Sequence, residues 1–545
     1  MSNLSKTDIC AHCQGLLLRP EESLEVGGSL FSSSSQIEIR TQDVRTAALN
    51  GCPICSLCWR YLQACSPDWH LSDERPLTLV LELNTFHRGY DNVVRSLMPG
   101  NIKDGFLHFY WQGRRFENPL SIALRRRNER KNDPHICQDS SISCILCHAP
   151  NSESPASIPI TTTRLAHSTG DQTRLATIKL LLASCVCKHI QTCHQDQQLK
   201  TGMLPRRLID VSIRDKPRLV LEEEFPSGDV RYATLSHRWG VESMPRLLQA
   251  NMTTLRRIIH PETLPRVFIE AMDLCQYLGI RYLWIDALCL IQDDEVDCTA
   301  EIKRMGDIYR HAFCNFSALA AARQSVGLYT EADPDISLAF PLTVQRGEQR
   351  VAFYGYLRRS ITQLNDEDLL RRGWVFQERL LSARTIHFGD QISWECADLL
   401  ANELFPGGVP DDLVVKPRSG LIDPFKVVCL LGCGHLLEAA SDDITAAQKR
   451  AIAYDRWFDM VGTYSARELT FEDDIFPAIS GLARDFNKVS KDRYLAGLWQ
   501  GKLLDGLLWG ICSTPSTYTL QSTSYRPKRY RGEPPFHTSF HVKHR

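Results

Sequence analysis

The sequence predicts an α/β fold with a mostly parallel sheet, and two apolar blocks joined by a helical pattern indicate it. Residues 232–236 and 282–290 are runs of apolar, aromatic and β-branched residues with the length of buried strands. Between them, apolar residues recur at helical spacing over 264–278, from a start at Pro265 to a stop at Gly279. Strands that alternate with helices of this length favour a parallel sheet covered on both faces.

The segments around these blocks extend the pattern in both directions. A strand-like segment at 204–212 precedes them, and Asp297 opens a second helix that leads to a third strand within 313–320. We expect Asp297 to cap that helix, because acidic residues accept hydrogen bonds from the first free backbone amides. Further on, 385–396 predicts a β-hairpin with a turn at Gly389.

The two ends of the chain differ from this central part. The N-terminal region is cysteine-rich and irregular, with a helix predicted at 177–184 and loops at 27–35 and 125–159. From 425 to 510 apolar and aromatic residues return to helical spacing, and the polar, basic tail is predicted to be disordered. We therefore predict a cysteine-rich N-terminal region, an α/β domain with a β-hairpin insertion, a helical C-terminal extension and a disordered tail, at 1–200, 201–400, 401–512 and 513–545.

Composition and charge exclude several classes of protein. The chain has 545 residues, and its 63 Lys and Arg residues almost balance its 64 Asp and Glu residues. Such a balance gives no long-range field that would attract nucleic acid or an anionic membrane. The first residues lack a basic region followed by an apolar core, and nowhere do eighteen apolar residues follow one another. We expect a cytoplasmic protein with neither a membrane nor a nucleic acid as partner.

Twenty cysteines in a long chain without an export signal are more typical of reduced thiols or metal ligands than of disulfides. Two Cys-x-x-Cys pairs near the N-terminus have the spacing that zinc requires, and their four thiolates would complete a tetrahedral site. Cys58 is a competing ligand, and unliganded thiols are the alternative. The zinc ligands predicted by these pairs are Cys10, Cys13, Cys52 and Cys55.

Two further groups are weaker metal candidates. One is Cys185-x-x-x-His189-x-x-x-Cys193, which has Cys187 and His194 nearby. The other is Cys144-x-x-Cys147-His148. Reduced thiols without a metal are again the alternative for both. No Walker-type phosphate loop and no Gly-x-Gly-x-x-Gly motif occurs, so dehydrogenase chemistry has no support.

Four blocks of the chain, in order, resemble the fungal heterokaryon incompatibility (HET) domain proteins. They are Tyr232-x-x-Leu-Ser-x-x-Trp-Gly240, Tyr282-x-Trp-Ile-Asp-x-Leu-Cys-x-Ile-Gln-Asp-Asp294, the helix from Asp297 to Ala312, and Arg372-Gly-Trp-Val-Phe-Gln-Glu-Arg-Leu-Leu-Ser382. Weaker matches extend the resemblance over roughly residues 200 to 510. The chain departs from the family in having His237 in place of Tyr and Ala287 in place of Ser. An aromatic segment expected after Trp509 is replaced, so we expect the end of the chain to be altered or truncated.

The resemblance implies a role in allorecognition, a form of fungal innate immunity. Activated proteins of this family trigger cell death when incompatible cells fuse. The HET domain is also distantly similar to TIR domains, which have a flavodoxin-like doubly wound sheet. Some TIR domains hydrolyse NAD with a glutamate, so the resemblance implies NAD as a substrate and a carboxylate as the catalytic group.

The candidate site lies where the predicted strands end. In a parallel sheet, ligands bind beyond the carboxyl ends of the strands, and polar residues follow both apolar blocks there. An arginine suits phosphate, a tryptophan suits a base or nicotinamide ring, and a carboxylate suits ribose hydroxyls or a developing sugar cation. The catalytic candidates are Glu301 and Asp286, and the ligand-binding candidates are Ser236, His237, Arg238, Trp239, Arg372, Trp374, Gln377, Glu378 and Arg379.

Each candidate has a structural alternative. Trp239 and Trp284 are also suited to core packing, and Asp286 to capping the turn that follows it. Glu301 has an ion pair with Arg304 on a solvated surface as its alternative. The polar group at 372–379 is equally suited to an ion-pair network that braces the fold.

Two functions from different classes therefore stay open. The protein is either an enzyme that cleaves NAD or a related nucleotide, or a signalling module that acts by assembling with itself or with an incompatibility partner protein. In the second case the aromatic blocks are core residues only.

Overall fold

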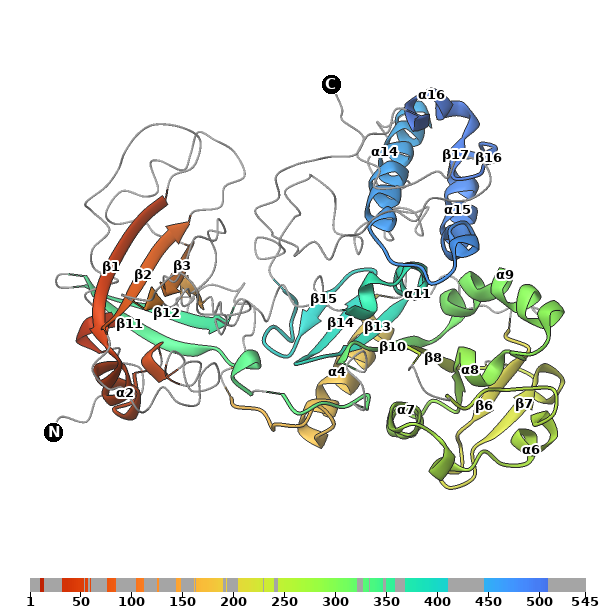
Figure 1. Cartoon of the computed structure of the whole chain (residues 1–545), viewed down its shortest axis with the longest axis horizontal. Coiled ribbons are helices and arrows are strands. Elements are labelled where there is room, and N and C mark those ends of the chain that lie inside the picture. Colours follow the sequence, from red (N-terminus) through yellow and green to blue (C-terminus); the bar gives the residue numbers. More distant parts are fainter. Residues whose placement is uncertain are drawn as a thin grey trace. The chain divides into compact units, whose positions relative to one another are not determined.

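The computed structural model describes residues 10–13, 32–52, 54–56, 59, 76–84, 104–111, 125–126, 144–148, 161, 163–189, 193, 204–228, 230–239, 244–320, 327–332, 334–346, 349–357, 368–409 and 446–507. These residues belong to two compact units (Figure 1). The described residues within 1–165 and 334–360 form one unit, and those within 166–333 and 361–507 form the other. The disordered tail predicted from 513 lies outside the described residues.

The first unit contains an antiparallel sheet with the strand order β1-β2-β3-β5-β12-β11, in which β4 pairs with β2. A helix, α2 (Thr41–Leu49), follows the first strand. Part of the region predicted to be loop is therefore strand, since β1 begins at Ser32 and β4 and β5 fall within 125–159. The strands are β1 (Ser32–Arg40), β2 (Pro76–Asn84), β3 (Asp104–Trp111), β4 (Arg125–Arg126), β5 (Cys144–His148), β11 (Phe340–Arg346) and β12 (Gln349–Leu357).

The second unit contains a mixed sheet with the order β15-β14-β13-β10-β8-β9-β6-β7. The four middle strands, β13, β10, β8 and β9, are parallel to one another, and antiparallel strands extend the sheet on both sides. The α/β prediction is confirmed, and the sheet is parallel only in its centre. The strands are β6 (Arg207–Asp210), β7 (Arg218–Leu221), β8 (Tyr232–Ser236), β9 (Tyr282–Trp284), β10 (Cys314–Ala318), β13 (Arg384–Phe388), β14 (Ile392–Cys396) and β15 (Leu400–Asn402).

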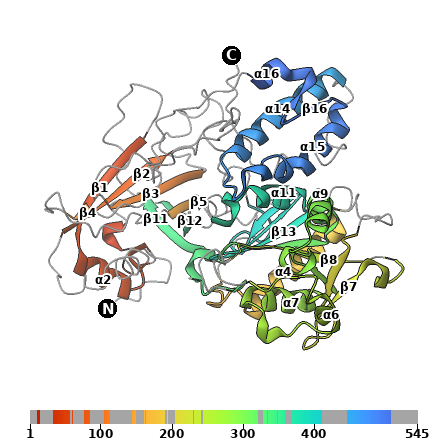
Figure 2. The same ribbon diagram turned by 45° about the vertical axis from the view of Figure 1, so that its right-hand side comes forward.

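Helices cover both faces of this sheet. Figures 1 and 2 show α9 (Glu295–His311) and α11 (Gly373–Leu381) on one face, and α4 (Gln172–Lys188) and α7 (Arg266–Leu278) on the other. Helix α7 ends as predicted at Gly279, whose φ of 73° lies in the left-handed region that glycine adopts without strain. Because α7 and α9 lie on opposite faces, the chain changes faces between β9 and β10.

Two local predictions in the central blocks are wrong. The second strand, predicted over 282–290, ends at Trp284, and Asp286 opens the short helix α8 (Asp286–Cys289). Helix α9 begins at Glu295 and is capped by Asp294, whose carboxylate accepts hydrogen bonds from the backbone amides of Val296 and Asp297. Asp297, predicted to be the cap, instead binds Arg207, because its side chain faces the neighbouring strand β6.

The C-terminal helices are α14 (Ala446–Ser465), α15 (Pro477–Ser490) and α16 (Leu503–Leu507). Of these, α15 packs against α9 and α11, and α14 contacts α11 through the rings of Tyr464 and Phe376. Helices α9 and α15 cross closely at Gly306 and Gly481, and a Cβ on Gly306 would lie 3.0 Å from Gly481 Cα. A Cβ on Gly481 would also lie 2.7 Å from Leu381 Cδ1 of α11. Within 446–507 the helical prediction is confirmed except between α15 and α16, where Tyr494–Leu495 (β16) and Leu498–Trp499 (β17) form a short hairpin, and 425–445 lies outside the described residues.

The predicted hairpin at 385–396 is confirmed as the antiparallel pair β13 and β14. The remaining short helices are α6 (Met252–Arg257) and the 3-10 turns Glu222–Glu224, Pro261–Thr263, Pro334–Ser337, Asp368–Arg371, Glu472–Asp474 and Gln500–Lys502. Among the residues described, no helix has the length and apolar character needed to cross a membrane.

Candidate functional site

The carboxyl end of β8 lies where the order of the parallel strands reverses. The chain runs from β8 to its neighbour β9 and then returns to β10 on the other side of β8. In open parallel sheets such a reversal leaves a place beyond the strand ends where ligands bind, and the order β9-β8-β10-β13 follows the flavodoxin-like pattern. The segment that leaves β8 here is the one predicted to contain binding residues.

A row of buried polar side chains runs across one face of the sheet beneath this point. Residues two apart along a strand share a face, and strand pairing aligns them between neighbours. On the central strand β10, Asn315 pairs with Thr234 of β8 and Thr385 of β13, and Ser317 pairs with Ser236 and His387. Every one of these side chains is buried; they are Thr234, Ser236, Asn315, Ser317, Thr385, His387, Ser393 and Glu395.

Ser236 of this row contacts Glu378 of α11. The Ser236 hydroxyl donates a hydrogen bond of 2.5 Å to Glu378 Oε2, and Asn315 Nδ2 donates to the same hydroxyl over 3.0 Å. Burial raises the pKa of Glu378 to about 7, and the nearby charge of Asp286 contributes to the rise while Ser236 and Arg372 oppose it. Glu378 is thus a buried carboxyl group that takes up and releases a proton near neutral pH.

Asp286 is more exposed than Glu378, and the side chains of Trp239 and His237 lie around its carboxylate. Its carboxylate accepts hydrogen bonds from Trp239 Nε1 over 2.8 Å and from the Ala287 amide over 2.7 Å. His237 Nδ1 lies 3.8 Å from it, and the side chain of Asp286 is 27% exposed. Its side chain therefore contacts both the first turn of α8 and the residues at the end of β8, and the cap position of α8 is Ile285. Burial lowers the pKa of His237, whose ring packs edge-on against Phe268.

Two arginines border this group. Arg372 Nη1 donates to the backbone carbonyl of His237 over 2.8 Å, which ties the start of α11 to the end of β8. Arg238 is exposed, and no described residue forms a hydrogen bond or an ion pair with it. The structure thus brings six of the predicted residues to the end of β8 in two contact groups, Ser236 with Glu378, and Asp286 with Trp239, His237 and Arg372, and Arg238 adjoins them.

Glu301 makes its contacts elsewhere. It is 1% exposed and pairs with Arg206 Nε over 3.3 Å and Arg304 Nη1 over 3.0 Å. The expected ion pair with Arg304 is present, but the expected solvated surface is not. Burial raises the pKa of Glu301, and its Oε2 has no hydrogen-bond partner among the described residues. Glu301 therefore lies in an ion-pair cluster with Arg206, Arg207 and Asp297, apart from the Ser236 and Asp286 contacts.

The other residues of α11 brace the fold. Trp374 Nε1 donates to Asp474 over 2.9 Å, and Gln377 bonds to the backbone at the start of α15 through Pro477 and Gly481. Arg379 forms a bidentate pair with Glu395, which also contacts His387 Nε2 at 3.0 Å. The contacts of these three residues fit the bracing network that the sequence left open.

Sequence reasoning missed Asn315, Thr234 and Tyr309 as members of the site. Thr234 donates to Asn315 Oδ1 over 3.0 Å, and Tyr309 lies above them with its hydroxyl 3.4 Å from the Leu235 carbonyl. A signal was present in the sequence, because β8, β10 and β13 each carry polar residues at every second position within an apolar run. Trp284, by contrast, is 1% exposed and packs edge-on against Tyr309 as a core residue.

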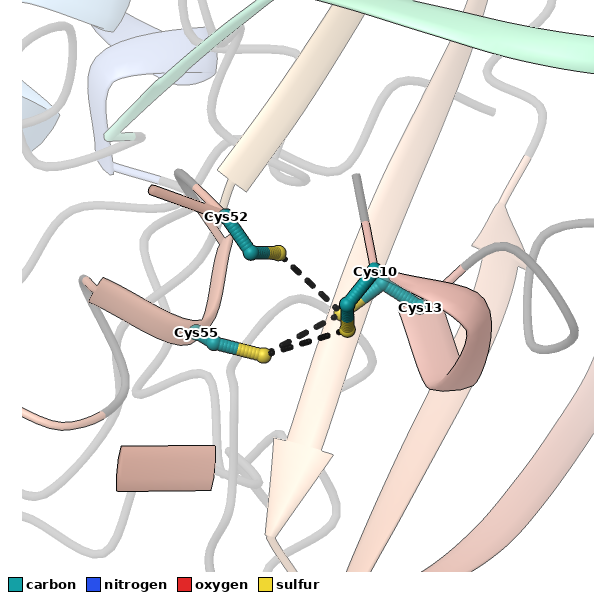
Figure 3. A group of neighbouring side chains, drawn as sticks. All are labelled: Cys10, Cys13, Cys52 and Cys55. Atoms are coloured by element: carbon teal, nitrogen blue, oxygen red, sulfur yellow. Dashed lines mark hydrogen bonds between the residues drawn. The ribbon is translucent and has the colours of Figure 1, made fainter. Parts of the chain in front are cut away.

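The four predicted cysteine ligands meet in the first unit (Figure 3). Cys55 Sγ lies 3.6 Å from Cys10 Sγ and 3.5 Å from Cys13 Sγ, and Cys52 Sγ lies 3.9 Å from Cys13 Sγ. Tetrahedral zinc with bonds of about 2.3 Å separates its sulfur ligands by about 3.8 Å. Three of these cysteines are buried, and all four are free thiols. The group can hold a metal ion. The side chains of the weaker candidate at 144–148 lie outside the described residues.

A family model described as heterokaryon incompatibility protein (HET) matches residues 232–378. The match begins with β8 and ends at Glu378, so it contains the whole strand-order reversal and both partners of the Ser236–Glu378 bond. The fold is thus that of an α/β protein whose strand order reverses at the end of β8, where such sheets bind ligands. The chain carries a HET domain over residues 232–378. No curated protein and no solved structure matches the chain.

Proposed function

We propose that the HET domain of this chain triggers cell death in heterokaryon incompatibility by cleaving NAD or NADP at the end of β8. The HET match supports a role in heterokaryon incompatibility. The observation that carries the enzymatic proposal is the Ser236–Glu378 pair, a titratable carboxyl group at a strand-order reversal, next to the partly exposed carboxylate of Asp286.

The exposed groups give the binding part of the proposal. Arg238 is available to a diphosphate, and Trp239 presents an indole ring, held by Asp286, on which a base or nicotinamide ring stacks. Asp286 binds ribose hydroxyls and stabilises the positive charge that develops on the sugar as the bond to nitrogen breaks.

The reaction needs water as its only co-reactant. The bond between ribose C1′ and the nicotinamide nitrogen breaks, and its electron pair leaves with neutral nicotinamide. Water adds to C1′ and loses one proton, which a carboxylate accepts. With a pKa of about 7, Glu378 is suited to accept it through the Ser236 hydroxyl. Some TIR domains hydrolyse NAD with a glutamate, and Glu301 is the second candidate for the catalytic carboxylate.

The contacts also support one alternative. Ser236, Trp239 and Arg372 each have a partner within the protein, as a purely structural network requires. In that case the HET domain acts by self-assembly or by binding an incompatibility partner, without chemistry.

Incubation of the purified protein at high concentration with NAD or NADP, followed by chromatography for nicotinamide, tests the proposal. We expect nicotinamide release that falls at least tenfold in Asp286→Asn and Glu378→Gln. Glu295→Gln, which changes an exposed glutamate of α9, is the matched control and should keep full activity. Equal activity in all these variants contradicts the site, and loss only in Glu301→Gln transfers the role to Glu301. Absence of release at every concentration favours the assembly module.

For the first unit we propose structural zinc held by Cys10, Cys13, Cys52 and Cys55. A closed set of four thiolates leaves no open position for a substrate, so the metal would stabilise this cysteine-rich segment. Metal analysis of Cys52→Ser should show the loss of one zinc per chain, and an unchanged zinc content would contradict this assignment.

A further inference from the structure

We propose that the second unit contains its own structural zinc site, formed by Cys185, His189, Cys193 and Cys396. The first three residues come from the end of α4 and the turn after it, and the fourth ends β14. Cys396 and His189 are 207 residues apart in the sequence, yet their Sγ and Nδ1 atoms lie 3.4 Å apart. The sequence spacing indicated three ligands, and the fold supplies the fourth.

Two backbone hydrogen bonds place the first three ligands at the spacing of successive helical turns on one path. The His189 amide donates to the Cys185 carbonyl, and the Cys193 amide donates to the His189 carbonyl. Residues four apart on such a path lie on the same face. The ligand atoms of all four residues lie within 4.8 Å of one another, so small side-chain movements would bring them to the separation of about 3.8 Å or less that one tetrahedral ion requires.

Burial and charge favour a metal over free thiols. Cys185, Cys193 and Cys396 are 1%, 3% and 4% exposed, so three thiols converge in the interior. The fully buried Arg384 donates from Nε to Cys185 Sγ over 3.2 Å and from Nη2 to the Cys193 carbonyl over 3.3 Å. Zinc with three thiolates and a neutral histidine carries one net negative charge, which this guanidinium balances.

The ligand set also defines what the site does. Three cysteines and a histidine fill the four positions of zinc, so no position is left for a substrate or a water nucleophile. The ion would join α4 to β14, one of the antiparallel strands that extend the sheet. Both attachment points lie outside the HET match at 232–378, so the site fixes flanking segments onto the HET domain.

Zinc analysis of full-length variants tests the assignment. We expect Cys396→Ser to contain one zinc per chain less than the wild type. Cys187→Ser is the matched control, because Cys187 lies on the same helix two residues from Cys185 but is exposed, and it should keep the wild-type zinc content. Cys396→His preserves a zinc ligand and should retain the metal, which separates loss of ligation from loss of folding.

A second measurement does not depend on any variant of this site. A chain with Cys10, Cys13, Cys52 and Cys55 changed to serine should retain zinc, and X-ray absorption should report three sulfur ligands and one nitrogen ligand around it. Sulfur-only coordination in that chain, or no bound zinc, would overturn the proposal. So would a disulfide between any two of Cys185, Cys193 and Cys396 in protein purified without oxygen.

Discussion

Glu378 and Arg379 are consecutive residues of α11, yet they enter two different buried networks above the same face of the sheet. Glu378 is held by a neutral hydroxyl, Ser236, at the point where the strand order reverses. Arg379 pairs with Glu395, which also contacts His387, on the antiparallel side of the sheet. Burial alone raises the pKa of a carboxyl group, and it does so for both glutamates. For Glu395, however, the Arg379 guanidinium reverses the effect and holds the pKa well below its usual range.

The comparison separates a bracing group from a reactive one. A buried carboxylate with a bidentate arginine stays ionised at every physiological pH and fixes two elements together. A buried carboxyl group that is bonded to a hydroxyl, without a bidentate arginine, changes its protonation near neutrality, as catalytic acids and bases do. Two equally buried glutamates of the same protein thus have pKa values shifted in opposite directions. The side chain bonded to each carboxyl group decides the direction.

The largest expected effect comes from removing the cation of the bracing pair. Arg379→Met should lower the free energy of unfolding by about 3–5 kcal/mol, because it leaves the Glu395 carboxylate buried without its charge partner. Denaturant unfolding monitored by fluorescence measures this. Adding Glu395→Gln should recover much of the loss, and Arg214→Met, which removes an exposed ion pair with Asp273, should cost little. A small loss for Arg379→Met would remove the distinction between the two networks.

The second effect is a pH dependence that belongs to Glu378. Its pKa rises from an ordinary 4.5 to about 7 on folding, so the folded state holds the proton more tightly. The resulting stability is fully present below about pH 4.5 and declines until about pH 7, by roughly 3 kcal/mol in total. Wild type should therefore lose stability relative to Glu378→Gln between pH 5 and pH 8. Unfolding curves of both proteins across this range measure it, and parallel profiles would contradict the raised pKa.

The smallest effect concerns the hydroxyl that holds Glu378. Ser236→Ala should cost about 1.5–2 kcal/mol at pH 8, where Glu378 is ionised, and less at pH 5. Ser317→Ala is the matched control on the paired position of β10, because Ser317 Oγ has no hydrogen-bond partner among the described residues. Thermal unfolding of both variants at the two pH values provides the comparison. Equal losses for the two serines would show that the Ser236–Glu378 bond has no special role.

Much of the core fold was predictable because its signals are local. The strand at 232–236, the helix ended by Gly279 and the 385–396 hairpin were found from apolar periodicity and turn residues. The second strand was overextended because Leu288, Cys289 and Leu290 are apolar in a short buried helix as they would be in a strand. Periodicity over so few residues does not separate the two.

The candidate site was predictable in its residue types but not in its pairings. That Ser236 and Asp286 follow strands can be read from the sequence. That Ser236 binds Glu378, 142 residues later, and that Glu301 turns to Arg206 and Arg304 cannot be, since both depend on which face of the sheet α9 and α11 cover.

The sequence by itself determined the HET resemblance, the alternation of strands and helices, and the four cysteines of the first unit, whose paired spacing is a local property. Only the tertiary structure decided which buried charges are paired and that Cys396 joins Cys185, His189 and Cys193. The reason is physical: a carboxyl group or a thiol takes its chemistry from its neighbours in space. Those neighbours are supplied by strand order and by helices that the chain reaches hundreds of residues later.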